Sequence, residues 1–102
     1  MANTAKALYR GAATTNTGTV LYTVPASTTS VITNIVVVNT NTSAAATYTL
    51  ALDGVSLFPG TTIPAGGIVT VDVKQVLTTT KTITGGASAT TVNFHISGME
   101  IA

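Results

Sequence analysis

The sequence lacks cysteine and tryptophan altogether, and charged residues make up only 7% of it. Without cysteine, neither a disulfide scaffold nor a thiolate metal site can form. Acid–base catalysis and multi-ligand cation sites need several ionisable groups in one place. The ionisable side chains are instead few and dispersed along the chain: Lys6, Arg10, Asp53, Asp72, Lys74, Lys81, His95 and Glu100. We therefore expect no catalytic residues, no metal site and no cofactor, and we expect the protein not to be an enzyme.

Long apolar runs and strong charge of either sign are also missing. The net charge is +1, so there is no basic footprint of the kind that binds nucleic acid. The longest apolar run covers residues 35–38, far short of the roughly 20 residues that span a bilayer. The first ten residues lack the basic-then-apolar order of a secretory signal. We expect neither a nucleic-acid partner nor a membrane partner.

Threonine takes the place of the missing charges, with 23 copies among 102 residues. Threonine is β-branched like valine, and both favour strands, so the exposed faces of a β-rich fold would carry hydroxyl groups. A surface with few charges is poorly protected against self-association. We expect a homo-oligomer whose neighbours cover much of this surface; the alternative is a monomer kept soluble by its hydroxyls.

Short segments of alternating apolar and polar residues, separated by glycine, proline and asparagine, run along most of the chain. The pattern predicts a single antiparallel β-sandwich of seven or eight short strands over residues 18–102, either jelly-roll-like or immunoglobulin-like, with almost no helix. Asp53-Gly54 has the composition of a two-residue hairpin turn. Pro59-Gly60 and Gly85-Gly86 are expected to end strands. The predicted strands cover residues 19–24, 30–39, 47–52, 55–58, 68–77, 81–84 and 90–97.

The segment covering residues 30–39 has the strongest strand pattern, and it is apolar on both sides. Strict alternation places Val31, Thr33, Ile35 and Val37 on one face and Ile32, Asn34, Val36 and Val38 on the other. Such a strand is typical of the centre of a sheet. One face would be covered by the core, and the other by a loop of the same chain or by an adjacent subunit. In the last predicted strand, Val92, Phe94 and Ile96 are expected to point inward.

Residues 1–17 show no sustained period and are interpreted as an N-terminal arm. Lys6, Leu8, Tyr9 and Arg10 bring two basic groups and a tyrosine into one short stretch. A segment of this kind can be disordered alone and become ordered against a partner. These four residues are the candidate partner-binding site. The alternative is an edge strand around residues 7–10.

The remaining polar residues are best explained without special chemistry. His95, the single histidine, is expected on the outward face of the last strand, where a catalytic role would need a nucleophile and a carboxylate beside it. Asp72 and Lys74 lie two apart on one strand face, as a solvent-exposed or cross-strand pair. For a carbohydrate-binding sandwich, Tyr48 or Tyr9 would be the only candidates for an exposed aromatic.

Three stretches together resemble the small threonine- and alanine-rich structural proteins encoded among the virion genes of tailed bacteriophages. They are residues 21–26 leading into 31–35, residues 50–55, and the ending over residues 92–100. The resemblance covers residues 8–101 and rests on packing and turn motifs.

This resemblance implies a non-enzymatic β-sandwich in the virion, assembled in the bacterial cytoplasm and commonly trimeric. The implied role is capsid decoration (cement), with the major capsid protein or another virion protein as partner. The alternative is a tail or head-fibre component that binds a receptor or carbohydrate.

Overall fold

The chain folds into eight β-strands and, over residues 3–102 that this computed structural model describes, no helix. Within that range, then, no helix is long and apolar enough to cross a membrane. The strands are β1 (Asn3–Ala12), β2 (Val20–Thr23), β3 (Thr29–Asn39), β4 (Ala46–Leu52), β5 (Val55–Ile63), β6 (Ile68–Leu77), β7 (Thr82–Ala87) and β8 (Val92–Ile101).

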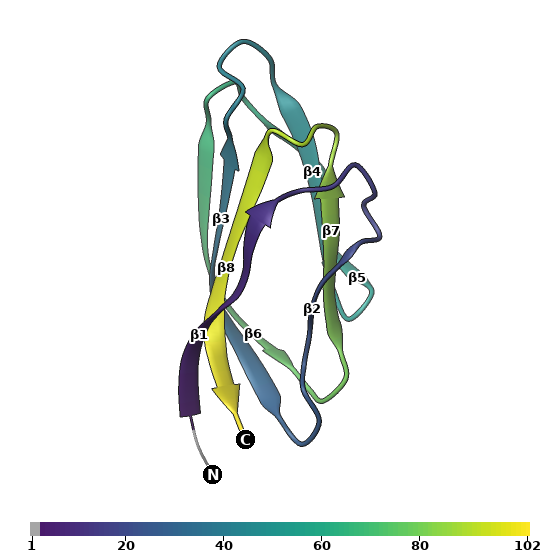
Figure 1. Cartoon of the computed structure of the whole chain (residues 1–102), viewed down its shortest axis with the longest axis vertical. Coiled ribbons are helices and arrows are strands. Elements are labelled where there is room, and N and C mark those ends of the chain that lie inside the picture. The colour runs from purple at the N-terminus through teal and green to yellow at the C-terminus, as the bar shows by residue number, and fades with distance from the viewer. Residues whose placement is uncertain (1–2) are drawn as a thin grey trace.

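The eight strands form two four-stranded antiparallel sheets that pack face to face (Figure 1). Sheet A has the order β1-β8-β3-β6, and sheet B has the order β2-β7-β4-β5. The first strand thus pairs with the last, the second with the seventh, the third with the sixth and the fourth with the fifth. This nested pairing, in which every connection except β4–β5 crosses between the sheets, is that of a jelly roll. The predicted all-β sandwich is confirmed, and the connectivity selects the jelly roll over the immunoglobulin alternative.

The core lies between the two sheets and is built from alternate residues of the central strands. Tyr48 of sheet B packs at its centre, with its ring centroid 6.4 Å from that of Phe94 in sheet A and 5.4 Å from that of Phe58. The predicted inward residues of β8 are confirmed as core. The largest fully buried side chains are Tyr48, Phe94, Ile32, Ile35, Leu50, Ile63, Ile83, Ile96, Val24, Val37, Val92 and Asn39.

Strand β3 is central, as predicted, but its two faces are not the ones that strict alternation gives. The pairing with β8 shifts register between Ile32 and Asn34, so Thr33 is an extra residue at a β-bulge. Because a bulge exchanges the two faces, Ile32 points into the core together with Ile35. Val31 joins Val36 on the outer face instead. The predicted division of β3 is therefore wrong on the N-terminal side of Thr33.

The Asp53-Gly54 hairpin is confirmed, since both residues have positive φ (54° and 73°), as a type I′ turn requires. The two expected strand ends are wrong. Strand β5 continues through Pro59 and Gly60, because proline is tolerated on an edge strand and Gly60 takes a positive φ of 61° beside a register shift.

Strand β7 continues through Gly85 and Gly86, because both glycines lie against neighbouring backbone. A Cβ on Gly85 would come within 2.5 Å of the Thr49 carbonyl oxygen, and one on Gly86 within 2.5 Å of that of Asn16. Gly85 therefore allows the close approach of β4, Gly86 allows that of the loop before β2, and neither marks a turn.

The N-terminal segment is an edge strand where we predicted an arm. Residues 3–12 form β1, which pairs along its length with β8. This matches the edge-strand alternative, although the strand is longer than residues 7–10. The strand forms because the segment pairs with β8, which is far away in the sequence. The segment's own sequence has no strand periodicity and so does not predict this pairing. Residues 1 and 2 of the predicted arm lie outside the described residues.

Candidate partner-binding surface

The four residues predicted to bind a partner are divided between the two faces of β1. By its pairing with β8, Lys6 lies opposite Gly98 and Tyr9 opposite Ile96, both inward positions. Leu8 is the extra residue at a register shift and is buried. Only Arg10, opposite His95, lies on the outer face of sheet A. The predicted cluster is therefore not one surface, because strand alternation and a bulge separate its members.

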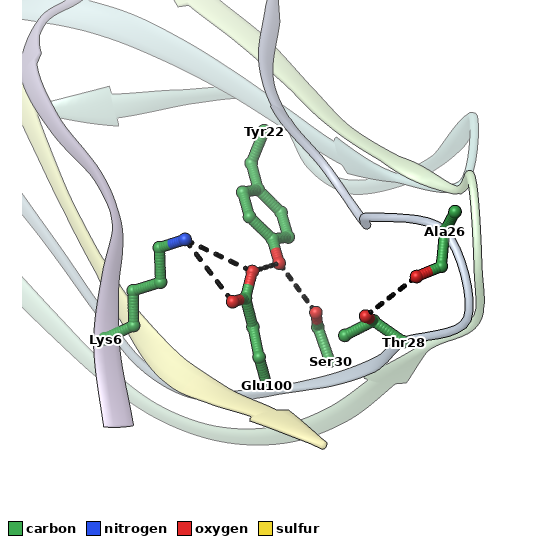
Figure 2. A network of polar contacts seen from close by, with 6 residues as sticks. All are labelled: Lys6, Tyr22, Ala26, Thr28, Ser30 and Glu100. Atoms are coloured by element: carbon green, nitrogen blue, oxygen red, sulfur yellow. Dashed lines mark hydrogen bonds and ion pairs between the residues drawn. The ribbon is translucent and has the colours of Figure 1, made fainter. Parts of the chain in front are cut away.

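Lys6 forms an ion pair within the chain (Figure 2), at the end of the sandwich where the two ends of the chain lie (Figure 1). Its ammonium is 3.3 Å from Glu100 Oε1 and 3.4 Å from Oε2. On the far side, the Tyr22 hydroxyl donates to Glu100 Oε2 at 2.5 Å. Lys6 and Glu100 belong to sheet A and Tyr22 to sheet B. We call Lys6, Tyr22, Ser30 and Glu100 the terminal clasp, because they join the two sheets through side chains.

Ser30 completes the terminal clasp, with its hydroxyl oxygen 2.7 Å from that of Tyr22. A tyrosine hydroxyl has one proton, and Glu100 receives it, so Ser30 must donate to Tyr22. Burial, followed by the bond to Glu100, raises the pKa of Tyr22 to about 12. The bond from Tyr22, then that from Lys6, lowers the pKa of Glu100. The arrangement thus holds a neutral tyrosine against an ionised carboxylate and ties the sheets together.

Leu8 and Tyr9 also serve the fold. A Cβ on Gly98 would overlap the Val31 carbonyl oxygen and lie 2.8 Å from Leu8 Cδ1, so this glycine leaves room for both the β3 backbone and the Leu8 side chain. The Tyr9 hydroxyl donates to the Ala12 carbonyl oxygen at 2.9 Å. Neither side chain projects freely from the molecule, and both help to hold β1 in place.

The outer face of sheet A is the feature best suited to contact a partner. The sequence predicted one part of it, the apolar second face of β3. Cross-strand neighbours share a face, and Val31 lies opposite both Met99 of β8 and Val76 of β6. Val38 lies opposite Ile68. Ile68 and Val76 are 67% and 62% exposed, among the most exposed large apolar side chains of the described residues. We define the sheet A patch as Val31, Val36, Val38, Ile68, Val76 and Met99.

Polar groups lie among and beside the residues of the sheet A patch. His95 lies on the outer face as predicted, between Arg10 of β1 and Val36 of β3. Asp72 and Lys74 are exposed on β6, and the Asn34 amide donates to Asp72 Oδ1 at 3.3 Å. The row formed by Asn34, Asp72 and Ser97 therefore separates the apolar side chains at the Val31 end of the face from those at the Val38 end, and a mixture of apolar and polar groups is usual in protein–protein contact surfaces. The predicted apolar second face of β3 is thus present, and half-exposed.

The other singled-out residues lie elsewhere. Tyr48, a candidate sugar-binding aromatic, is only 1% exposed and cannot form a surface platform. Asp53 forms an exposed ion pair with Lys81 at 3.6 Å across the hairpin end. Over residues 3–102, no three His, Cys, Asp or Glu side chains lie together, and no pocket is formed.

Sequence reasoning missed the terminal clasp, because Tyr22 and Glu100 are 78 positions apart. A signal for Glu100 did exist. The inward series Val92, Phe94 and Ile96 continues with the same parity to position 100, so extending the last strand beyond residue 97 would have placed this carboxylate inward. Its tyrosine partner comes from the opposite sheet, and no local pattern indicates it.

Comparison with protein-family models finds no matching family, and a search of curated proteins finds no related sequence.

Proposed function

We propose that this chain is a structural protein of a tailed-bacteriophage virion, a capsid decoration (cement) protein that binds the outside of the shell and stabilises it through many non-covalent contacts. The observation that carries the proposal is the sheet A patch. It offers a row of apolar side chains across three neighbouring strands, Met99 of β8, Val31 of β3 and Val76 of β6. The resemblance of the sequence to phage virion proteins supplies the class of partner.

The chemistry of this face suits repeated, modest contacts. The Val31, Met99 and Val76 row carries no charge itself, so covering it requires no desolvation of an unpaired charge, which is costly. One copy contributes a small interface, but a shell presents many equivalent sites. Attachment at several points then strengthens the assembly by avidity without any new contact. The partner is the major capsid protein or another virion protein, and the protein acts in the virion.

The test is co-sedimentation of the purified protein with tailed-phage capsids that lack it, followed by thermal challenge of the decorated shell. We expect saturable binding and a higher disruption temperature. Val36→Lys places a charge in the sheet A patch and should abolish binding. Thr47→Lys adds the same charge to an exposed site on sheet B and should bind normally. Normal circular dichroism of both variants checks the fold. Failure of the wild-type protein to bind capsids would refute the proposal.

The number of copies of this protein per virion distinguishes capsid decoration from the second candidate function, a tail or head-fibre component that binds a receptor or carbohydrate. Jelly rolls also occur in lectin domains, which supports this second candidate. Burial of Tyr48 leaves Tyr9 as its aromatic, and the Tyr9 hydroxyl is already donated to Ala12. Gel densitometry of purified virions against the major capsid protein should give hundreds of copies for decoration. A dozen copies or fewer, together with glycan binding lost in Tyr9→Ala, would assign the fibre role.

A further inference from the structure

Strand β6 forms an exposed edge of sheet A. It pairs with β3 on one side and ends the strand order on the other, so the backbone groups along its free side have no strand partner. The strand is ten residues long, contains no proline and has one register shift against β3, between Asp72 and Gln75. An edge of this kind is a ready template for another strand, and joining through it would extend the sheet.

The other edges are less suited to pairing. Strand β2 has only four residues. Strand β5 contains Pro59 and two register shifts against β4. Strand β1 has a bulge at Leu8 and carries Lys6 and Arg10, which are both basic. Two copies joined through β1 would gain no complementary charges, whereas β6 carries one charge of each sign.

The charges on β6 are complementary to those of a second β6 strand that runs antiparallel to it. Asp72 and Lys74 are both exposed, and the alternation of side chains along β6 places them on one face, one residue apart. Over residues 3–102 the ion pairs are Lys6–Glu100 and Lys81–Asp53, so neither Asp72 nor Lys74 is in an intramolecular ion pair. Asp72 accepts a hydrogen bond from the Asn34 amide at Oδ1, and neither charge is balanced by an ion pair within the chain.

Two-fold pairing restricts the possible registers. Opposed residues in an antiparallel pair share a face, so the register can change only in steps that keep outward residues opposite outward residues. The three central registers place Asp72, Val73 or Lys74 opposite itself. The first opposes two carboxylates and the third opposes two ammonium groups, both of which are unfavourable. Only the register centred on Val73 sets Asp72 of each copy opposite Lys74 of the other.

We propose that two copies of this chain associate through antiparallel pairing of their β6 strands, centred on Val73, with two reciprocal Asp72–Lys74 contacts. Residues 69–77 of one copy then lie opposite residues 77–69 of the other. The two four-stranded sheets A become one continuous sheet with both sheet A patches on the same side. A two-fold contact uses the same surface on both copies, so it closes as a dimer and differs from the trimer that the sequence resemblance implies.

The experiment measures the oligomeric state of the purified full-length chain by sedimentation velocity and native mass spectrometry, from about 10 µM to 1 mM at low salt, because a contact of this size is weak. Wild type should form a dimer as concentration rises. Asp72→Lys and Lys74→Asp each set like charges opposite one another, and each should raise the dissociation constant at least about tenfold. Arg10→Asp, a matched charge change on the β1 edge, should leave the dimer unchanged.

Two restoration tests identify the register. The double variant D72K/K74D should recover the wild-type dimer, because the exchange keeps opposite charges facing. A mixture of the D72K chain and the K74D chain should form a heterodimer, since one brings two lysines and the other two aspartates. Amide exchange along β6 should slow with rising concentration. A wild-type monomer at 1 mM, a trimer, or a dimer indifferent to both single substitutions would overturn the proposal. None of these measurements involves a virion, so the test of the dimer is independent of the test of the proposed function.

Discussion

Replacing Tyr22 with phenylalanine tests whether the terminal clasp holds the two sheets together. The change removes one hydroxyl and keeps the ring. It deletes the 2.5 Å bond to Glu100, and hydrogen bonds to charged groups contribute about 1.5–3 kcal/mol. It also leaves the buried Ser30 hydroxyl without its acceptor. Glu100 keeps Lys6 as a partner, so we expect a loss of about 2 kcal/mol in the free energy of unfolding.

Urea denaturation followed by circular dichroism measures this loss. A destabilisation of about 2 kcal/mol corresponds to a fall in Tm of about 8–16 °C for a domain of this size. Tyr9→Phe is the matched control, because its hydroxyl donates to an exposed backbone carbonyl and its removal should cost under about 1 kcal/mol. If Tyr22→Phe costs less than about 0.5 kcal/mol, as an ordinary surface substitution does, the clasp does not stabilise the fold.

The same contacts predict how stability changes with pH. The pKa of Glu100 is lowered in the folded protein, so its contribution is present above the unfolded value and is lost as pH falls through the folded value, below about 4.5. The pKa of Tyr22 is raised to about 12, so its contribution is complete below pH 10 and is lost between pH 10 and about 12. Stability curves of Glu100→Gln should show a weaker acid dependence than wild type. Identical acid limbs would contradict the assignment.

Three further changes test the fold. Ile35→Asp should prevent folding, since an unpaired charge at a fully buried site costs several kcal/mol. Val36→Asp, on the outer face of the same strand, should still fold. Circular dichroism distinguishes the two variants. Gly98→Ala should lower the free energy of unfolding by about 1–3 kcal/mol, because the added Cβ overlaps the Val31 carbonyl oxygen and crowds Leu8, and an unchanged urea midpoint would contradict the close approach. Deletion of residues 1–12 removes β1 and should leave the protein unstable or aggregated in size-exclusion chromatography; a folded, monodisperse product would support the arm interpretation instead.

Much of the architecture follows from local pattern. The strict alternation of Val92, Phe94 and Ile96 gave both the strand and its buried face, because one side of that strand meets the core. The Asp53-Gly54 turn was predictable because few residue pairs accept positive φ at two successive positions. The apolar second face of β3 was also evident from the sequence. The bulge at Thr33, which exchanges the inward and outward positions, was not. A bulge depends on the neighbouring strand, since β8 has one residue fewer at that point.

The candidate surface was harder to predict. Lys6, Leu8, Tyr9 and Arg10 are neighbours in the sequence, and proximity suggested a common role. Pairing with β8 turns three of them inward or buries them and leaves Arg10 on the outer face. The terminal clasp shows the same dependence on pairing, because Tyr22 meets Glu100 only when the two sheets stack.

Composition and periodicity were enough to establish an all-β sandwich with little reactive chemistry, because side-chain alternation and turn preferences are local properties of the chain. The jelly-roll connectivity, the burial of Leu8 and the free edge at β6 could not be read in this way. Each depends on which strands become neighbours, and that choice is made by the packing of two sheets whose residues are far apart in the sequence. The same long-range pairing leaves Asp72 and Lys74 exposed on an unpaired strand, where they can meet a second copy.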